Sequence, residues 1–369
     1  MARLARVEIF APDEIAIVHV MNRTVRRCFL MGEDPLTGKN YEHRKAWCEE
    51  QLIKQAALFG IDLLTYAILS NHFHLVLRSR PDVVQSWDDA EVARRWLLLC
   101  PLRKGPDGEA EEPTAFELDC IRNHPQRVAE LRTRLSDISW WMRLLCQKIA
   151  QRANKDDGEV GKFWQARFKA VRLLDEAALM ACSVYVDLNP IRAAMAKTLE
   201  ESDFTSAQKR IASLQPSAND LLPVQGAPSS HQSEHALHCD LPASQPLPDR
   251  HLSPVHLDER SASIGVNLSE SGYRASDKGF LPVTTADYLE LLDWTARELK
   301  ANARGQTPPT LRPLFERLGM NTATWCSVVQ DFGRLFYVMA GKPHVIDGQT
   351  SRDGKRHYKV KPNTRKLMS

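Results

Sequence analysis

Two apolar runs joined by a very short connection constrain this chain more than any other feature of its sequence. Residues 61–69 form the first run, residues 73–78 the second, and Ser70-Asn71 connects them. This spacing predicts an antiparallel β-hairpin. Because side chains alternate between the two faces of a strand, His72 and His74 share one face, while the apolar residues between and after them face a core.

The histidine pair has two interpretations. Two imidazoles on one strand face are close enough to bind one metal ion. Alternatively, both rings are simply hydrogen-bonded within a half-buried strand. The pair alone does not decide between a metal site and a structural role.

Composition limits the class of protein. With 369 residues, of which 43% are hydrophobic and 26% charged, the chain has enough apolar material for two domains. The net charge is only +3, so a polyanionic partner has to be argued from local basic patches. The eight cysteines form no Cys-x-x-Cys pair, and we find no signal peptide and no run long enough to span a bilayer. We therefore expect reduced thiols, no membrane association and a cytoplasmic location.

Hydrophobic periodicity predicts strands at 15–21 and 163–173 in addition to the hairpin. It predicts helices at 41–59, 88–100, 128–153 and 175–188, the third of these with arginine and lysine on its exposed side. Asp88 and Asp175 are expected to cap the second and the last of these helices. The segment 101–125, rich in charge, Pro and Gly, is expected to be an insertion. These elements predict an α+β catalytic domain over residues 1–212.

The helix predicted at 175–188 carries Tyr185, and Asn189 follows four residues later, just before Pro190. Residues four apart lie on the same side of a helix, so a phenol and an amide are presented together. The alternative is that Tyr185 is a core residue with a hydrogen-bonded hydroxyl.

Basic side chains alternate with aromatic ones in the segment 163–173, a combination that can follow a phosphate backbone. Together with basic residues in the turn after the first strand and after Asn189, this segment gives a set of expected DNA contacts. The set is Arg23, Arg26, Lys162, Trp164, Arg167, Lys169, Arg172 and Arg192.

The C-terminal part divides into two regions. Residues 213–278 are rich in Ser, Pro and His and are expected to be a disordered linker, in which we attribute the metal-like spacing of His231, His235, His238 and Cys239 to coincidence. Residues 279–369 are expected to form a small helical accessory domain with helices at 284–302, 311–318 and 322–340, the first capped by Thr285. Its tail, from Arg352 to Lys366, is basic and is either a solvated terminus or a nucleic-acid contact.

The order of these motifs resembles the single-tyrosine transposases of the HUH endonuclease superfamily, most closely the REP-associated tyrosine transposases. The motifs are His72-Phe-His74, Phe163-Trp-Gln-Ala-Arg-Phe168 and Tyr185-Val-Asp-Leu-Asn-Pro-Ile-Arg192, and the resemblance covers roughly residues 14 to 200. It implies that His72 and His74 are the paired metal ligands, Tyr185 the nucleophile and Asn189 a third ligand. The implied fold is a ferredoxin-like antiparallel sheet of four or five strands with helices on one face. The segment 101–125 departs from the family pattern.

The implied reaction is metal-dependent cleavage and rejoining of single-stranded or hairpin DNA through a 5′-phosphotyrosine. Two neutral imidazoles and an amide would leave the charge of Mg²⁺ or Mn²⁺ available to a phosphate oxygen. The expected partner is DNA, and the chain is expected to act as a monomer or homodimer. A domesticated nickase of the same chemistry fits equally well, and a DNA-binding regulator that has lost turnover is the alternative from another class. The sequence identifies no general base.

Overall fold

A five-stranded mixed sheet forms the centre of the computed structural model, which describes residues 6, 9–35, 37–215, 247–257, 265–300, 307–353 (of 350–353 the backbone only) and 360–368. The strands are β1 (Ile17–Arg23), β2 (Ile61–Ile68), β3 (His72–Ser79), β4 (Lys169–Leu173) and β5 (Met339–Ala340), in the order β2-β3-β1-β4-β5. The first four pair antiparallel, and β5 pairs parallel to β4. The predicted α+β class is confirmed. The expectation of a purely antiparallel sheet is wrong, because the C-terminal part adds a parallel strand.

The predicted hairpin is present as β2 and β3. Its turn is closed by a hydrogen bond of 2.8 Å, in which the Leu69 amide donates to the carbonyl oxygen of His72. On its other side β3 pairs with β1, and this register places Met21 opposite His74. Phe73 and its alternate neighbours enter one hydrophobic core, so the two histidines face the opposite side of the sheet.

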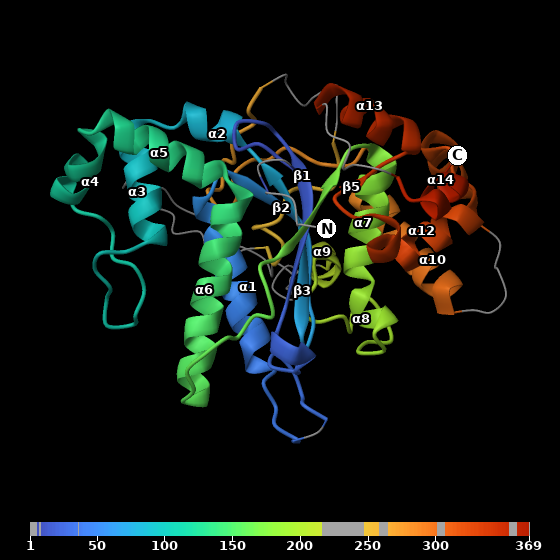
Figure 1. Cartoon of the computed structure of the whole chain (residues 1–369), viewed down its shortest axis with the longest axis horizontal. Helices are drawn as coiled ribbons and strands as arrows, with labels where there is room; N and C mark the ends of the chain where they lie inside the picture. The colour runs from blue at the N-terminus through green and yellow to red at the C-terminus, as the bar shows by residue number, and fades with distance from the viewer. Residues whose placement is uncertain are drawn as a thin grey trace, which may run out of the picture.

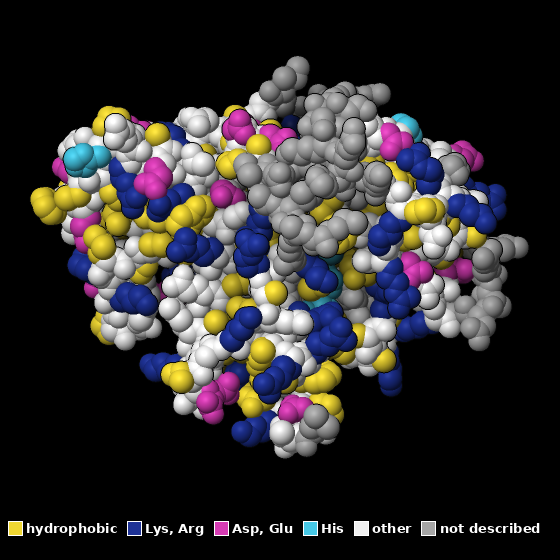
Figure 2. Space-filling model, in the orientation of Figure 1, with side chains coloured by type: hydrophobic (Ala, Val, Ile, Leu, Met, Phe, Trp, Pro, Cys, Tyr) yellow, Lys and Arg dark blue, Asp and Glu magenta, His cyan; other side chains and the backbone are white. Residues whose placement is uncertain are grey.

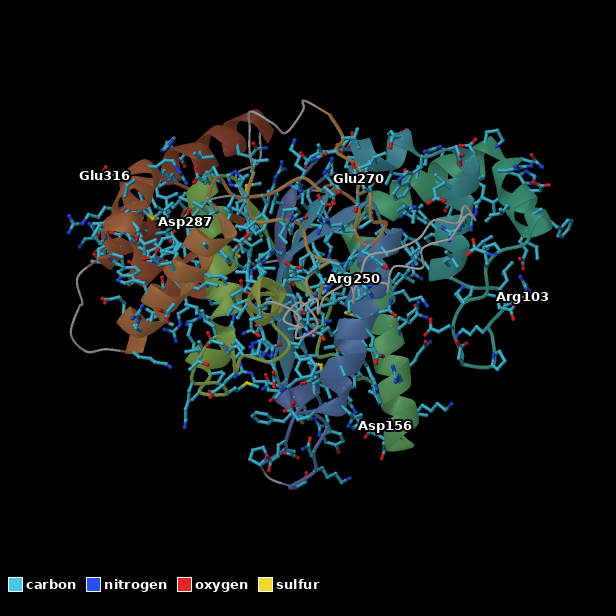
Figure 3. The ribbon with its side chains drawn as sticks, turned by 180° about the vertical axis from the view of Figure 1, so that it is seen from behind. Arg103, Asp156, Arg250, Glu270, Asp287 and Glu316 are labelled. Atoms are coloured by element: carbon cyan, nitrogen blue, oxygen red, sulfur yellow. The ribbon has the colours of Figure 1, made fainter. Side chains whose placement is uncertain are left out.

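Helices α1 (His43–Leu58) and α6 (Ile138–Asp157) run side by side on one face of the sheet (Figure 1). Asp156 lies near the end of α6 (Figure 3). The buried guanidinium of Arg44 on α1 bonds to it at 2.8 Å. The same face carries α2 (Pro81–Ser86), α3 (Asp89–Leu99), α4 (Ala115–Arg122) and α5 (Pro125–Ser136). The predicted insertion at 101–125 thus contains a helix of its own. The single helix expected at 128–153 is two helices, because Asp137 interrupts it and caps α6.

The opposite face is covered by α7 (Glu176–Asp187), followed by α8 (Asn189–Arg192) and α9 (Ser206–Leu214). Asp175 caps α7 as predicted, since its carboxylate accepts the Ala178 amide at 2.8 Å. Nearly every side chain of α7 is buried, which is typical of a helix enclosed between two layers. The expectation that helices cover only one face is therefore wrong.

The C-terminal part supplies the outer layer over α7. Its helices are α10 (Thr285–Lys300), α11 (Arg312–Leu318), α12 (Thr322–Leu335), α13 (Pro343–Asp353) and α14 (Pro362–Met368). Helix α12 lies along α7 (Figure 1), and its buried Trp325 and Phe332 belong to the same hydrophobic core as α7. This region is therefore not a separate accessory domain, because it shares a core with the sheet and extends it with β5. Its first helix is capped by Thr284 rather than Thr285.

Parts of the expected linker are ordered and buried. The Ser253 amide donates to the carbonyl oxygen of Leu63 on the outer strand β2 at 3.0 Å, and Leu252 and Val255 are buried. These contacts cover a sheet edge that would otherwise expose unpaired backbone groups. The linker expectation is wrong for residues 247–257 and 265–278. The four spaced His and Cys residues at 231–239 and the tail side chains at 352–359 lie outside the described residues.

Two further expectations concerned reduced thiols and the lack of a membrane-spanning segment. In the described part, seven cysteines are present and all are unpaired. No helix among the described residues is both long and apolar enough to cross a membrane.

Asp187, at the end of α7, ties the C-terminal part to the sheet. Its buried carboxylate accepts hydrogen bonds from the Tyr288 hydroxyl at 2.7 Å, the Ser206 hydroxyl at 2.5 Å and the Ala207 amide at 3.2 Å.

Tyr288→Phe should therefore lower the free energy of unfolding by about 1.5–3 kcal/mol, as expected for a hydrogen bond to a charged group. Urea denaturation measures this loss. Tyr273→Phe, at an exposed tyrosine, is the matched control and should change nothing. Equal stability of the two variants would contradict the role of Asp187.

Candidate active site

Strand β3 and helix α7 bring together the residues that the two main motifs predict. The ring centroids of His72 and His74 are 5.0 Å apart, and the Tyr185 ring lies 5.4 Å from that of His74 at an angle of 89°. Asn189 begins α8, and its side-chain amide donates to the Tyr185 carbonyl oxygen at 3.0 Å. His72, His74, Tyr185 and Asn189 therefore lie together on the face of the sheet that α7 covers.

A third histidine belongs to this site and was missed from the sequence. His19 on β1 lies diagonally across from His74, and its Nε2 is 2.8 Å from Nδ1 of His74. The side chain is 6% exposed, and its ring is 6.0 Å from that of Tyr185. A signal was available: His19 is a polar residue inside an apolar strand, and a buried polar side chain needs a partner.

The C-terminal part also contributes to the site. Phe332 on α12 stacks on Tyr185 with ring centroids 5.6 Å apart and an angle of 29°. The next residue is Gly333, where an added Cβ would lie 3.4 Å from the tyrosine hydroxyl oxygen. Helix α12 therefore covers the tyrosine closely. Nothing in the local sequence around Phe332 indicates this contact, since it depends on how distant segments pack.

A cavity of about 450 Å³ opens beside these rings and is lined by His19, His74 and Tyr185. Cationic side chains make up much of its wall, and among the described residues no Asp or Glu lines it; the cations are Arg6, Arg23, Arg27, Arg167 and Lys169. Figure 2 shows Lys and Arg side chains around the centre of the side of the molecule in view, with a histidine side chain visible between them. Such a wall attracts phosphate groups.

Burial keeps the imidazoles neutral. It lowers the pKa of His19 and of His72 to about 4, and it lowers the pKa of His74 well below its ordinary value of 6.5. Burial also raises the pKa of Tyr185, against the opposing effect of Arg192, whose guanidinium lies 4.9 Å above the ring centroid. At neutral pH the site therefore presents uncharged nitrogen ligands and a protonated phenol.

The hydrogen bonds of His72 and Asn189 leave each of them an atom that could bind a metal ion. Asn71 donates its side-chain amide to the Arg27 carbonyl oxygen at 3.2 Å, so its oxygen faces Nδ1 of His72, 2.6 Å away. His72 Nδ1 must carry the proton, which leaves Nε2 free as a ligand. The side-chain nitrogen of Asn189 likewise donates to the Tyr185 carbonyl oxygen, and this hydrogen bond does not involve the side-chain oxygen of Asn189. In the described part of the chain, no group of three or more His, Cys, Asp and Glu side chains could hold a metal ion, so any site depends on two imidazoles and this amide.

The expected DNA contacts separate into two groups. Arg23, Arg167 and Lys169 line the cavity and Arg192 lies over Tyr185, while Arg6 and Arg27 are cavity residues that the sequence did not indicate.

The remaining expected contacts lie elsewhere. Arg172 points to the other side of the strand, where it forms two hydrogen bonds of 2.8 Å with Glu14. Trp164 is buried against Phe73, and its indole donates to a backbone carbonyl. Neither side chain lines the cavity, because alternation along β4 turns Arg172 to the opposite face from Lys169 and Trp164, which precedes β4, packs against Phe73. Arg26 and Lys162 are exposed but do not line the cavity.

Comparison with known proteins gives one weak likeness. No family model and no curated protein matches the chain. Among solved structures, a REP-associated tyrosine transposase bound to a REP hairpin matches 64% of this chain and 99% of that chain, with 13% identity and a TM-score of 0.32. The function of this chain therefore has to be inferred from its own residues.

Acid should destabilise the fold. Burial lowers the pKa of His19 and His72 to about 4 and that of His251 to about 3, whereas in the unfolded chain these residues protonate near pH 6.5. Below pH 6.5 the unfolded state therefore binds more protons, and stability falls as the pH is lowered towards 4. Each histidine should remove about 2 kcal/mol from the free energy of unfolding at pH 5.

Urea denaturation at pH 7 and pH 5 measures this effect. His251→Leu should make the drop smaller by the share of one histidine, whereas His344→Gln, at an exposed position, should leave the drop unchanged. A free energy of unfolding that is the same at both pH values would show that these histidines do not stay neutral in the fold.

Proposed function

We propose that this protein is a DNA strand transferase that cleaves and rejoins single-stranded or hairpin DNA with Tyr185 as nucleophile, in a ferredoxin-like domain of the HUH endonuclease type. One observation carries the proposal: the Tyr185 ring stands against His74 at the edge of a cavity whose charged lining is entirely cationic in the described part. A phenol, neutral imidazoles and cations without acids suit a reaction at a phosphodiester.

The cavity supports DNA as the substrate class. Arg23 comes from β1, Lys169 from the adjacent strand β4 and Arg167 from the segment before β4, so three neighbouring segments place cationic side chains on one cavity wall. At the rim, Tyr337 is 64% exposed and offers a ring on which an unpaired base can stack. Backbone phosphates and unpaired bases are the features of single-stranded or hairpin DNA that such a wall contacts.

The chemistry assigned to Tyr185 is an in-line attack on a backbone phosphate. The bond between the phenolic oxygen and phosphorus forms as the bond from phosphorus to the 3′-oxygen breaks, giving a 5′-phosphotyrosine and a free 3′-hydroxyl. The phenolic proton is lost, the 3′-oxygen gains one, and Arg192 stabilises the phenolate against the effect of burial. Attack by a 3′-hydroxyl reverses the step and rejoins DNA.

A divalent ion, Mg²⁺ or Mn²⁺, would be held by His72 Nε2, His74 Nε2 and the side-chain oxygen of Asn189. When bound, it would polarise a non-bridging phosphate oxygen. Asn189 also bonds the Tyr185 carbonyl, so it would link the position of the metal to that of the nucleophile.

A second function has one observation in its favour. Phe332 and Gly333 cover Tyr185, and burial raises the pKa of its hydroxyl, which reduces its reactivity. A DNA-binding regulator of the same fold that lacks turnover would have such a covered tyrosine. The assay for a covalent adduct separates this regulator from the transferase or a domesticated nickase.

Tyr185→Phe should abolish the covalent protein–DNA adduct while leaving folding and DNA affinity near those of the wild type, because it removes one oxygen and keeps the ring contacts. A hairpin oligonucleotide labelled on the 5′-phosphate side of the cleaved bond, incubated with Mn²⁺ and run on a denaturing gel, measures the adduct.

Tyr337→Phe is the matched control, since Tyr337 lines the same cavity with its ring in solvent, and the adduct should persist. An adduct that is lost in Tyr337→Phe and kept in Tyr185→Phe would exchange the two roles. Cleavage without an adduct, leaving a free 5′-phosphate, would indicate attack by water. A wild type that binds DNA without cleaving it would favour the regulator.

Arg167→Ala and Lys169→Ala should each weaken DNA binding and reduce the slope of log affinity against log salt by about 0.7–0.9, the value for one lost phosphate contact. Binding isotherms at several salt concentrations, with the metal chelated, measure the slope. Arg297→Ala is the control, since Arg297 is exposed on α10 and paired with Asp293. Equal slopes for all three variants would mean that DNA does not contact this wall.

A further inference from the structure

His19 and His74 meet edge to edge in the centre of the sheet. Their rings are nearly coplanar, at 8°, and the centroid separation of 5.1 Å is what a near-linear nitrogen contact of 2.8 Å between two coplanar imidazoles requires. The rings are thus side by side in one plane rather than face to face. This is the geometry of a strong hydrogen bond, and both partners are buried.

A hydrogen bond between two neutral imidazoles has only two arrangements. If His19 Nε2 donates, then His74 Nδ1 is the acceptor and the single proton of His74 lies on Nε2, where it excludes a metal ion. If His74 Nδ1 donates, then His74 Nε2 holds a free lone pair, and His19 carries its own proton on Nδ1. The direction of this one bond therefore decides whether His74 can act as a ligand.

The surroundings of His74 favour the second arrangement. Besides His19, the ring is surrounded by Tyr185, His72, Arg23 and Arg192, and none of these is a carboxylate that could accept a hydrogen bond from an Nε2 proton. In the described part of the chain the cavity beside it also lacks Asp and Glu. The positive charges of Arg23 and Arg192 act on the ring, and they favour a lone pair over an N–H at its outer nitrogen.

His72, the other proposed metal ligand, has the same arrangement: its Nδ1 atom donates to a neighbouring side chain. Asn71 holds the proton of His72 on Nδ1, as its own bond to Arg27 fixes the direction of its amide. If His19 plays the part for His74 that Asn71 plays for His72, both rings present Nε2 to the same space. Two ligands on one strand face can share an ion only if both Nε2 atoms are unprotonated.

We propose that His19 is a positioning residue: its Nε2 accepts the Nδ1 proton of His74, which fixes the orientation and tautomer of His74 and leaves Nε2 of His74 available to a divalent cation. The metal part of this inference rests on the proposed function. The tautomer itself does not, since it is a property of the protein without metal. Partners of this kind commonly change the affinity of a metal site by 10- to 100-fold.

The first test measures the tautomer directly. In metal-free wild-type protein labelled with ¹⁵N-histidine, long-range ¹H–¹⁵N correlation spectra should show His74 protonated at Nδ1 and His19 also protonated at Nδ1. The His74→Gln and His19→Gln variants assign the signals. A proton on Nε2 of His74 would overturn the proposal whatever the protein does with DNA.

The second test uses two substitutions of similar size. His19→Gln keeps an acceptor oxygen near the position of Nε2, and His19→Leu fills the space without one. Mn²⁺ affinity, measured by the decrease of the free-ion electron paramagnetic resonance signal, should fall roughly 10- to 100-fold in His19→Leu and return to within a few-fold of wild type in His19→Gln.

The outcomes separate this inference from the proposed function. Wild-type affinity for Mn²⁺ in His19→Leu, with binding lost in His72→Ala and His74→Ala, would overturn the role of His19 and leave the metal site standing. Absence of Mn²⁺ binding by the wild type would remove the metal from the proposed function, and the spectrum of His74 would still decide the hydrogen bond. Loss of binding in both His19 variants would reduce His19 to a packing residue.

Discussion

The packing of α7 between the sheet and α12 is the constraint on which the rest of the structure depends. Nearly every side chain of this helix is buried, and burying a side chain such as Leu179 or Val184 contributes about 1.5–3 kcal/mol. A helix that is apolar all round is stable only when it is covered on both sides. The sheet covers one side and the C-terminal helices cover the other, so Tyr185 is held over β3 by the same packing that makes the chain one unit.

Polar groups at the two ends of this helix fix its position along the sheet. At its start, Asp175 caps the first turn and also accepts the Lys342 amide at 2.6 Å, next to β5. At its end, Asp187 accepts hydrogen bonds from α9 and α10. Since a buried carboxylate is costly unless its lone pairs are satisfied, both ends resist sliding. The distance between Tyr185 and His74 is therefore set in part by polar contacts at both ends of α7, to which neither side chain contributes.

Electrostatics then divides the site into a neutral centre and a cationic wall. Burial keeps the three imidazoles uncharged, while Arg23, Arg167 and Lys169 line the cavity beside them. The carboxylate of Glu14 lies on the far side of the strand, where it accepts a hydrogen bond from Arg172. In the described part of the chain, a phosphate that enters the cavity meets cationic side chains without a competing carboxylate.

The sequence by itself determined the hairpin that carries His72 and His74, the cap at Asp175 and the placing of Tyr185 and Asn189 on one helical side. All of these depend on contacts between residues close in the chain, where alternation, helical spacing and turn chemistry act directly. Alternation along the strand could also have placed Arg172 on the face opposite Lys169 from the sequence alone. Only the tertiary structure decided that His19 lies against His74, that Phe332 covers Tyr185 and that Trp164 packs against Phe73. Strand order and the docking of the C-terminal helices set these contacts, and both are pairings between distant segments that share no local pattern. The part of 213–278 that proved ordered shows the same limit, because its few apolar residues become buried only against a sheet edge that the rest of the chain provides.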